Sequence, residues 1–346
     1  SPINTNTHQH QNSHPSPTMS TTTTKALSLL VLLFFVSLVH ATDPCLINSI
    51  YQFGDSIADT GNLIRNGPTG AKSHAASFPY GQTYFQQATV NFAVAGSTAL
   101  NSSFFTSRNL HVPATNTPLS TQLSWFKSHL RSTCHSPSCL KQSLIMMGEI
   151  GGNDYNYGFF QGKSTEEIRS YIPHVVGAIA AAARDVIRAG AVNVVVPGNF
   201  PVGCFPIYLT SFPVNDPKAY DDKGCLIRLN EFAMDHNNQL QEAISSLQKE
   251  FPGVVIVYGD YYNAFQYVLR GSVGFDKSVA LKSCCGVGGG YNYDGMRQCG
   301  AVGVPVCQNP DKFISWDGVH LTQKAYRFMS KFLNYKILPQ LKCGGA

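Results

Sequence analysis

Two short segments near opposite ends of the chain hold residues that could together form and use a nucleophile. The first, Phe53-Gly54-Asp55-Ser56, follows a short apolar run and leaves Ser56 where backbone N–H groups are free for a developing oxyanion. The second, Trp316-Asp317-Gly318-Val319-His320, has an acid three residues before a histidine. A serine needs an imidazole to take its proton, and that imidazole needs an acid to fix its tautomer. The pattern predicts Ser56 as nucleophile, His320 as base and Asp317 as its partner, although each motif alone is more often a turn or a helix cap.

Two further segments offer hydrogen-bond donors for the same chemistry. Gly151-Gly152-Asn153-Asp154 follows the apolar run 144–147, and the side-chain amide of Asn153 is a candidate oxyanion donor. The strand-like run 91–96 ends in Gly96, which would present an unobstructed backbone N–H. Taken singly, either segment is more often an ordinary strand-to-loop turn.

Four short apolar runs alternate with longer helical patterns and must position these residues. The runs 49–53, 144–147, 192–196 and 254–258 suit strands that are buried on both faces of a parallel sheet. Helical patterns cover 165–189 and 225–251, and a last one lies within 313–338, beginning near His320. The alternation predicts a three-layer α/β fold with a parallel sheet. Functional sites in such sheets lie beyond the carboxyl ends of the strands, where Ser56 and Asn153 fall.

The composition fits one large domain and gives no sign of nucleic-acid binding. Of the 346 residues 43% are hydrophobic and 13% charged, which is ample for one sizeable core. The formal net charge is +5, and the lysines and arginines are scattered rather than clustered. We therefore expect a single domain over 42–346 and no nucleic-acid partner.

The first 41 residues are predicted to lie outside that domain. Residues 1–18 are polar and lack periodicity, which suggests a leader or non-native addition upstream of a true start at Met19. Lys25 is followed by the apolar run 26–39, which ends at Val39-His40-Ala41, a small-residue cleavage pattern. Because the run is short for a bilayer span, a signal peptide over 19–41 is favoured over a membrane anchor. We expect a secreted protein, in the extracellular space, cell wall or vacuole.

The cysteines agree with export. An even number in an exported chain indicates disulfides, and zinc is disfavoured because no CxxC pair occurs. Proximity suggests the pairs Cys134–Cys139 and Cys204–Cys225, and the Gly- and Cys-rich region 284–310 is predicted to be a stapled loop. Asn101-Ser102-Ser103 is a glycosylation sequon, so Asn101 is a candidate glycosylation site. All ten cysteines follow the predicted cleavage point: Cys45, Cys134, Cys139, Cys204, Cys225, Cys284, Cys285, Cys299, Cys307 and Cys343.

The motifs together resemble one family. Their order is that of the SGNH hydrolases, and FGDSIADTGN, NFAVAGSTAL, GGNDYN, VPGNFPVGC and WDGVHLTQKAYR are similar to the plant GDSL lipase/esterase branch, nearest to members like acetylajmalan esterase. The resemblance implies a three-layer α/β/α, flavodoxin-like fold and a secreted serine esterase with the triad Ser56, His320 and Asp317. It also implies an oxyanion hole made by Ser56, Gly96 and Asn153, a small-molecule ester substrate, and no metal or organic cofactor. The oligomeric state is not indicated.

One departure from the family pattern leaves alternatives open. Relatives carry some tens of residues, including a helix, between the FPYG motif at 78–81 and the run at 91–96, and here only a few residues near 86–90 stand in their place. Loss of that helix should expose apolar surface and strain the loop that carries Gly96. A lost exon, a degraded relative and a tolerated deletion are competing explanations. The rival functions are an acyltransferase with the same triad and an inactive binding or defence protein.

Overall fold

The computed structural model describes residues 47–66, 73–80, 89–112, 116–136, 138–271 and 274–341. The predicted leader and signal peptide lie outside these ranges, as do Cys45, Cys343 and residues 81–88, which include most of the predicted deletion region. The domain bounds of 42–346 and the deletion near 86–90 therefore stay predictions.

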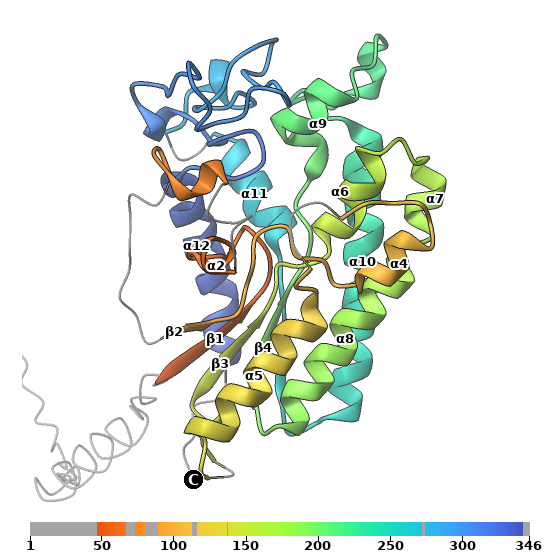
Figure 1. Cartoon of the computed structure of the whole chain (residues 1–346), viewed down its shortest axis with the longest axis vertical. Coiled ribbons are helices and arrows are strands. Elements are labelled where there is room, and N and C mark those ends of the chain that lie inside the picture. The colour runs from red at the N-terminus through yellow and green to blue at the C-terminus, as the bar shows by residue number, and fades with distance from the viewer. Residues whose placement is uncertain are drawn as a thin grey trace, which may run out of the picture. The chain divides into compact units, whose positions relative to one another are not determined.

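A five-stranded parallel sheet forms the centre of the domain (Figure 1). Its spatial order is β2-β1-β3-β4-β5, and every neighbouring pair is parallel. This order is flavodoxin-like and confirms the predicted α/β fold. The strands are β1 (Ser49–Phe53), β2 (Thr89–Asn91), β3 (Ser143–Met147), β4 (Asn193–Pro197) and β5 (Val255–Gly259).

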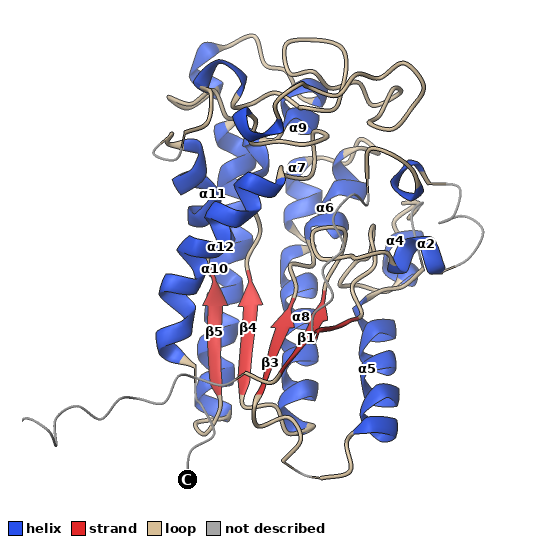
Figure 2. Ribbon diagram, turned by 90° about the vertical axis from the view of Figure 1, so that its left-hand side faces the viewer, coloured by secondary structure: helices blue, strands red, loops and turns tan. Residues whose placement is uncertain are grey.

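Helices cover both faces of this sheet (Figure 2). On one face lie α5 (Leu119–Thr133), α8 (Ile172–Arg188) and α10 (Ile227–Glu250); on the other lies α12 (Gln323–Ile337), with α11 (Tyr261–Leu269) beside it. Strand residues alternate accordingly, because Val194 and Val196 join the main core whereas Val195 packs with Ile337 of α12. The shorter helices are α2 (Asn62–Arg65), α4 (Ser102–Thr106), α6 (Gly152–Phe159), α7 (Thr165–Arg169) and α9 (Pro206–Ser211).

Two expected elements differ in the structure. The pattern over 165–189 forms two helices, α7 and α8, because Pro173 has no N–H to continue the first helix and suits the first turn of the second. Only the start of the strand-like run 91–96 is regular strand, which ends at Asn91, although the N–H groups of Phe92 and Val94 still donate to the carbonyls of Gln52 and Gly54. There the Asn91 side chain accepts from the N–H of Ala93 at 2.9 Å, and the Asn62 side chain donates to the Ala93 carbonyl at 2.8 Å, so side chains shape this segment as a loop.

Among the described residues, few cover the α12 side of the sheet near β1. Between β1 and β2 the described residues form only α2 and the short 3₁₀ turn His74–Ala76. Ile50, Leu144 and Met146 are only half-buried, and Ile50 belongs to neither hydrophobic cluster of the described residues. The missing helix itself stays a prediction.

The cysteine and membrane predictions can be tested in part. The two expected disulfides, Cys134–Cys139 and Cys204–Cys225, are both present, and Cys284–Cys307 and Cys285–Cys299 staple the predicted loop. No helix within the described ranges is long and apolar enough to cross a bilayer. Asn101 is exposed at the start of α4, and its glycosylation stays a prediction.

Candidate active site

The strand order brings three of the predicted site residues to one edge of the sheet. Loops that leave the carboxyl ends of β1 and β2 carry Ser56 and Gly96, and Asn153 stands in the first turn of α6, which follows β3. The connection from β1 goes to β2 on one side, whereas β3 lies on the other side of β1, so the loops after β1 and β3 diverge at a topological switch point. Such a point leaves a crevice in which a ligand can meet residues from both loops.

The turn after β1 is fixed from two sides. Gly54 has a φ of 146°, and a Cβ there would lie 2.8 Å from the carbonyl oxygen of Glu149, so glycine is required. The fully buried side chain of Gln122 on α5 accepts from the N–H of Gly54 at 3.0 Å and donates to its carbonyl at 2.8 Å. Ser56 is half-buried, and none of the hydrogen bonds among the described residues involves its N–H or its hydroxyl.

The loop that carries Gly96 is anchored to the DTGN motif behind Ser56. The carboxylate of Asp59 accepts from the N–H of Ala95 at 2.8 Å and from three N–H groups at the start of α2. Tyr157 on α6 donates its hydroxyl to the Gly96 carbonyl at 2.8 Å. The Gly96 N–H, like that of Ser56, takes part in no hydrogen bond within the described part of the chain.

Asp154 is a second anchor of the same loop, and the sequence did not single it out. It is fully buried, and its two carboxylate oxygens accept from the N–H groups of Ala99 at 2.8 Å and Leu100 at 2.9 Å. Burial raises the pKa of Asp154 to about 7, although the hydrogen bonds from Ala99 and Leu100 pull it down. The position next to Asn153 was the available signal, because the GGND segment was already a candidate motif.

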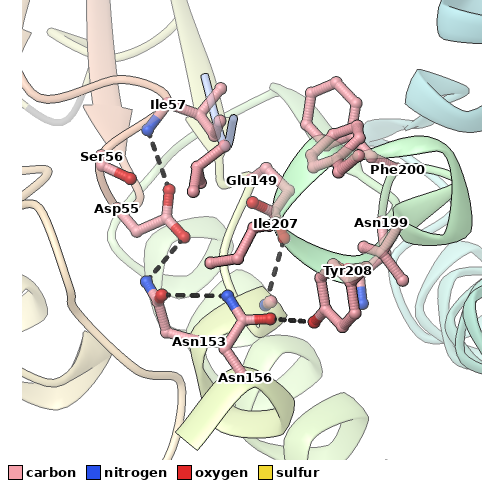
Figure 3. A pocket seen from close by; sticks show the side chains of 14 residues that line it. Asp55, Ser56, Ile57, Glu149, Asn153, Asn156, Asn199, Phe200, Ile207 and Tyr208 are labelled. Atoms are coloured by element: carbon pink, nitrogen blue, oxygen red, sulfur yellow. Dashed lines mark hydrogen bonds between the residues drawn. The ribbon is translucent and has the colours of Figure 1, made fainter. Parts of the chain in front are cut away.

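The amide of Asn153 points at the turn before Ser56 (Figure 3). Its Nδ2 donates to the Asp55 carboxylate and to the Ser97 carbonyl, both at 3.0 Å. Both of its N–H bonds are therefore in use, and an oxyanion would have to replace one of these acceptors. Burial raises the pKa of Asp55 to about 6, although the Ile57 N–H and the nearby His320 lower it.

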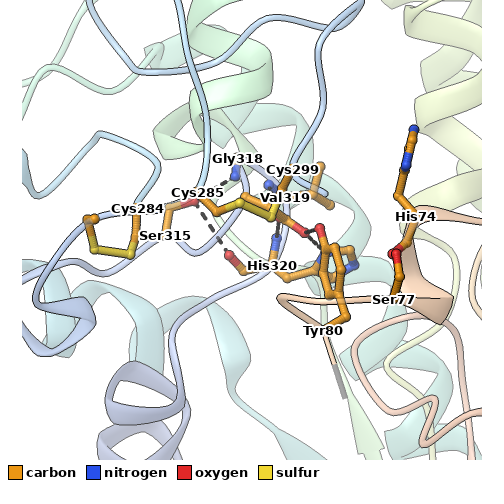
Figure 4. The surroundings of a disulfide bond; sticks show 12 residues. His74, Ser77, Tyr80, Cys284, Cys285, Cys299, Ser315, Gly318, Val319 and His320 are labelled. Atoms are coloured by element: carbon orange, nitrogen blue, oxygen red, sulfur yellow. Dashed lines mark hydrogen bonds and ion pairs between the residues drawn. A yellow bond between two sulfur atoms is a disulfide. The ribbon is translucent and has the colours of Figure 1, made fainter. Parts of the chain in front are cut away.

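Asp317 and His320 form a close pair just before α12, and Figure 4 shows His320 of this pair beside Val319. His320 Nδ1 lies 2.7 Å from Asp317 Oδ2, while Asp317 Oδ1 accepts from the N–H groups of Val319 at 3.0 Å and His320 at 2.8 Å. Burial opposes ionisation of Asp317, but the charge and hydrogen bonds of His320 prevail and lower its pKa to about 2. Burial would lower the pKa of His320, and the charge and hydrogen bond of Asp317 raise it instead.

The loop that holds this pair is tied to the disulfide-stapled segment 284–307. The N–H of Cys284 donates to the Ser315 carbonyl at 3.1 Å, and that of Cys285 donates to the Trp316 carbonyl at 2.6 Å. The ring of Tyr293 covers Gly318 so closely that a Cβ on Gly318 would lie 2.3 Å from it. The motif WDGVH therefore needs its glycine for packing as well as for its φ of 99°.

A pocket beside Ser56 extends to the loop that holds His320. Ser56 lines it from the turn after β1, and Val319, the neighbour of His320, lines it from the opposite end of the chain. Nε2 of His320 is buried and has no hydrogen-bond partner among the described residues, so no direct bond links it to Ser56. The cavity measures about 50 Å³ and has mixed walls, formed with Asp55, Ile57, Glu149, Gly152, Asn153, Asn156, Asn199, Phe200, Val202, Phe205, Ile207 and Tyr208. No cluster of three or more metal-ligating side chains occurs within the described ranges.

Comparison with known proteins identifies the family. The model of the GDSL-like lipase/acylhydrolase family matches residues 50–333. A GDSL esterase/lipase of Arabidopsis thaliana is 78% identical over 91% of this chain and 97% of its own length. Acetylajmalan esterase 1 of Rauvolfia serpentina is 44% identical over 86% of this chain and 89% of its own length, and acetylajmalan esterase of the same plant is 43% identical over 86% and 88%. The chain is therefore a serine ester hydrolase that belongs to the GDSL-like lipase/acylhydrolase family.

Proposed function

We propose that the chain hydrolyses esters of small acyl groups through an acyl-Ser56 intermediate. Nε2 of His320 takes the hydroxyl proton while Oγ of Ser56 bonds to the ester carbonyl carbon. The ester C–O bond then breaks, and His320 returns the proton to the departing alcohol. Water repeats both steps on the acyl-enzyme and releases the acid. Asp317 holds the imidazole in the tautomer that leaves Nε2 free.

One observation carries this proposal. The distance between His320 Nδ1 and Asp317 Oδ2 is only 2.7 Å, whereas Nε2, the other ring nitrogen, is buried and has no hydrogen-bond partner among the described residues. Val319, which precedes His320, lines the same pocket as Ser56. The free N–H groups of Ser56 and Gly96 are suited to receive the oxyanion. Asn153 is the third expected donor. To donate to the oxyanion, its amide gives up its hydrogen bond to the Asp55 carboxylate or to the Ser97 carbonyl.

The size of the pocket favours a short acyl group. A cavity of about 150 Å³ is enough to hold benzene, and this one measures about 50 Å³. Acetyl is a small acyl group, and the apolar side chains of Val202 and Ile207 are among those that line this space. The relatives named acetylajmalan esterase support acetyl esters of plant specialised metabolites as the substrate class.

Hydrolysis of nitrophenyl acetate and nitrophenyl octanoate tests the proposal. We expect the wild-type protein to prefer acetate and the Ser56→Ala variant to lose at least about a thousandfold in kcat. Ser245→Ala, an exposed serine on α10, is the matched control and should keep full activity. Equal rates for wild type and Ser56→Ala would refute Ser56 as nucleophile, and a preference for octanoate would refute the short-acyl assignment.

Export is the second part of the proposal. The predicted signal peptide, the four disulfides of the described region and the exposed sequon at Asn101 support it. Expression in plant cells with its own leader should place the protein in the apoplast or vacuole with Asn101 glycosylated. Cytosolic protein with free thiols would contradict this assignment.

A further inference from the structure

The side chain of Tyr80 reaches the Asp317–His320 pair from a distant part of the sequence, and Figure 4 shows Tyr80 near His320. The hydroxyl of Tyr80 donates to Asp317 Oδ2 at 2.7 Å, across a separation of 237 residues. The same oxygen lies 2.7 Å from His320 Nδ1. With the two backbone N–H groups on Oδ1, the carboxylate of Asp317 has two partners on each oxygen, which is close to its full capacity.

The segment 73–80 is shaped to present this hydroxyl. Ser73 caps the 3₁₀ turn His74–Ala76, and the N–H of Tyr80 donates to the Ser77 carbonyl at 3.1 Å. The ring of Tyr80 stands edge-on to Trp316, with ring centroids 6.5 Å apart. The segment also meets the disulfide-stapled loop, since a Cβ on Gly300 would lie 3.1 Å from the Cβ of His74.

The chemistry of this bond affects His320 through Asp317. A phenol that donates to Oδ2 draws negative charge away from the carboxylate and restrains its rotation. The imidazolium form of His320 is then stabilised less than it would be by a carboxylate without that donor. The other titratable groups near the pair are Asp55 after β1, Tyr293 in the stapled loop and Tyr326 on α12.

We propose that Tyr80 is a positioning residue that orients Asp317 and tunes the basicity of His320. The inference rests on the proposed function of Asp317 and His320. It adds a residue outside the catalytic motifs and gives a role to the FPYG motif at 78–81, which precedes the point where the chain departs from the family pattern. Tyr80 itself is not proposed to touch the reacting atoms.

Two replacements of Tyr80 should shift the pKa of His320 in opposite directions. In Tyr80→Phe the pKa of His320 should rise by about 0.5 pH unit, because Asp317 keeps more of its charge. The acid limb of kcat/KM should shift upward by the same amount, and its plateau should fall about tenfold through lost orientation. Incorporating 3,5-difluorotyrosine at position 80 gives a stronger donor and should lower the pKa of His320.

NMR titration of the His320 imidazole, assigned with His320→Gln, measures this pKa without turnover. Tyr335→Phe, on the exposed end of α12, is the matched control and should leave the pKa and the pH profile unchanged. A plateau that falls with no change in the pKa of His320 in either Tyr80 variant would reduce Tyr80 to a structural residue and overturn the proposal. If wild type and Ser56→Ala were equally inert, the proposed function would fail, and the NMR titration would still decide for or against Tyr80.

Discussion

Asp154 shows how one buried side chain ties the loop that carries Gly96 to the motif that carries Asn153. Each of its carboxylate oxygens accepts one backbone N–H, from Ala99 and from Leu100. An asparagine at this position has a single acceptor oxygen, and its NH₂ group would face a backbone donor. The loop that carries Gly96 therefore depends on a side chain with two acceptor oxygens at position 154.

We expect Asp154→Asn to lower the free energy of unfolding by about 2 kcal/mol, because one buried N–H loses its acceptor. The kcat/KM for nitrophenyl acetate should fall by about tenfold or more as the Gly96 N–H loses its fixed position. Urea unfolding and steady-state kinetics measure the two effects. Asp222→Asn, an exposed change, is the control. Unchanged kcat/KM in a destabilised Asp154→Asn protein would contradict the link between Asp154 and Gly96.

At the residue level, sequence reasoning found the motif residues and missed the residues that hold them. Ser56, Asp317 and His320 stand in short motifs whose chemistry can be read from their neighbours. Gln122 and Tyr80 act on residues 68 and 237 positions away, and no local pattern indicates such contacts. Asn153 stays a predicted oxyanion donor. Its hydrogen bonds to Asp55 and to the Ser97 carbonyl could not be predicted, because they depend on how segments after three different strands meet.

At the level of elements, the stapled segment 284–307 positions the loop of the acid–base pair. The cysteines at 284 and 285 each form a disulfide and each donate a backbone N–H to that loop. The sequence predicted a stapled loop but not this task, since the Cys284–Ser315 and Cys285–Trp316 contacts join segments with no shared pattern. The strands were predictable because continuous apolar runs mark them. The break between α7 and α8 was missed, although Pro173 inside the helical pattern was a signal for it.

Removing the Cys285–Cys299 disulfide should therefore impair catalysis more than removing a remote one. We expect the pair Cys285→Ala and Cys299→Ala to lower kcat/KM by about tenfold or more, because the loop carrying Asp317 and His320 becomes mobile. The chain-entropy cost to stability is on the order of 3 kcal/mol, so assays belong well below the midpoint of thermal unfolding. The matched control removes Cys134–Cys139, beyond α5. Equal losses in both double variants would argue against a positioning role for the stapled segment.

At the scale of the whole molecule, several buried groups hold protons differently in the folded and unfolded states. Burial raises the pKa of Glu149 well above its ordinary range and that of Asp154 to about 7, and Asp317 raises that of His320 despite burial. Burial lowers the pKa of His236 to about 3. Between about pH 3 and pH 6.5 the unfolded protein binds a proton at His236 that the folded protein does not, so His236 makes the free energy of unfolding rise with pH. That rise is largely over above the ordinary histidine pKa of 6.5.

The free energy of unfolding should consequently fall as the pH rises from about 6.5 to about 8. In that window Asp154, Glu149 and His320 each bind more protons in the folded than in the unfolded protein, so each loses stabilising influence with rising pH. Thermal unfolding across the window measures the slope, and Glu149→Gln should flatten it. A midpoint that rises with pH would show that these carboxyl groups are ionised in the folded protein.

The strand order has one more consequence, which concerns timing. Synthesis proceeds from the N-terminus, so the turn with Ser56 exists long before the loop with His320 has left the ribosome. In the proposed mechanism the nucleophile and its base come from opposite ends of the chain, so the central sheet must form before they meet. On that proposal, a nascent chain carries Ser56 without its base, and we expect no esterase activity until α12 has docked.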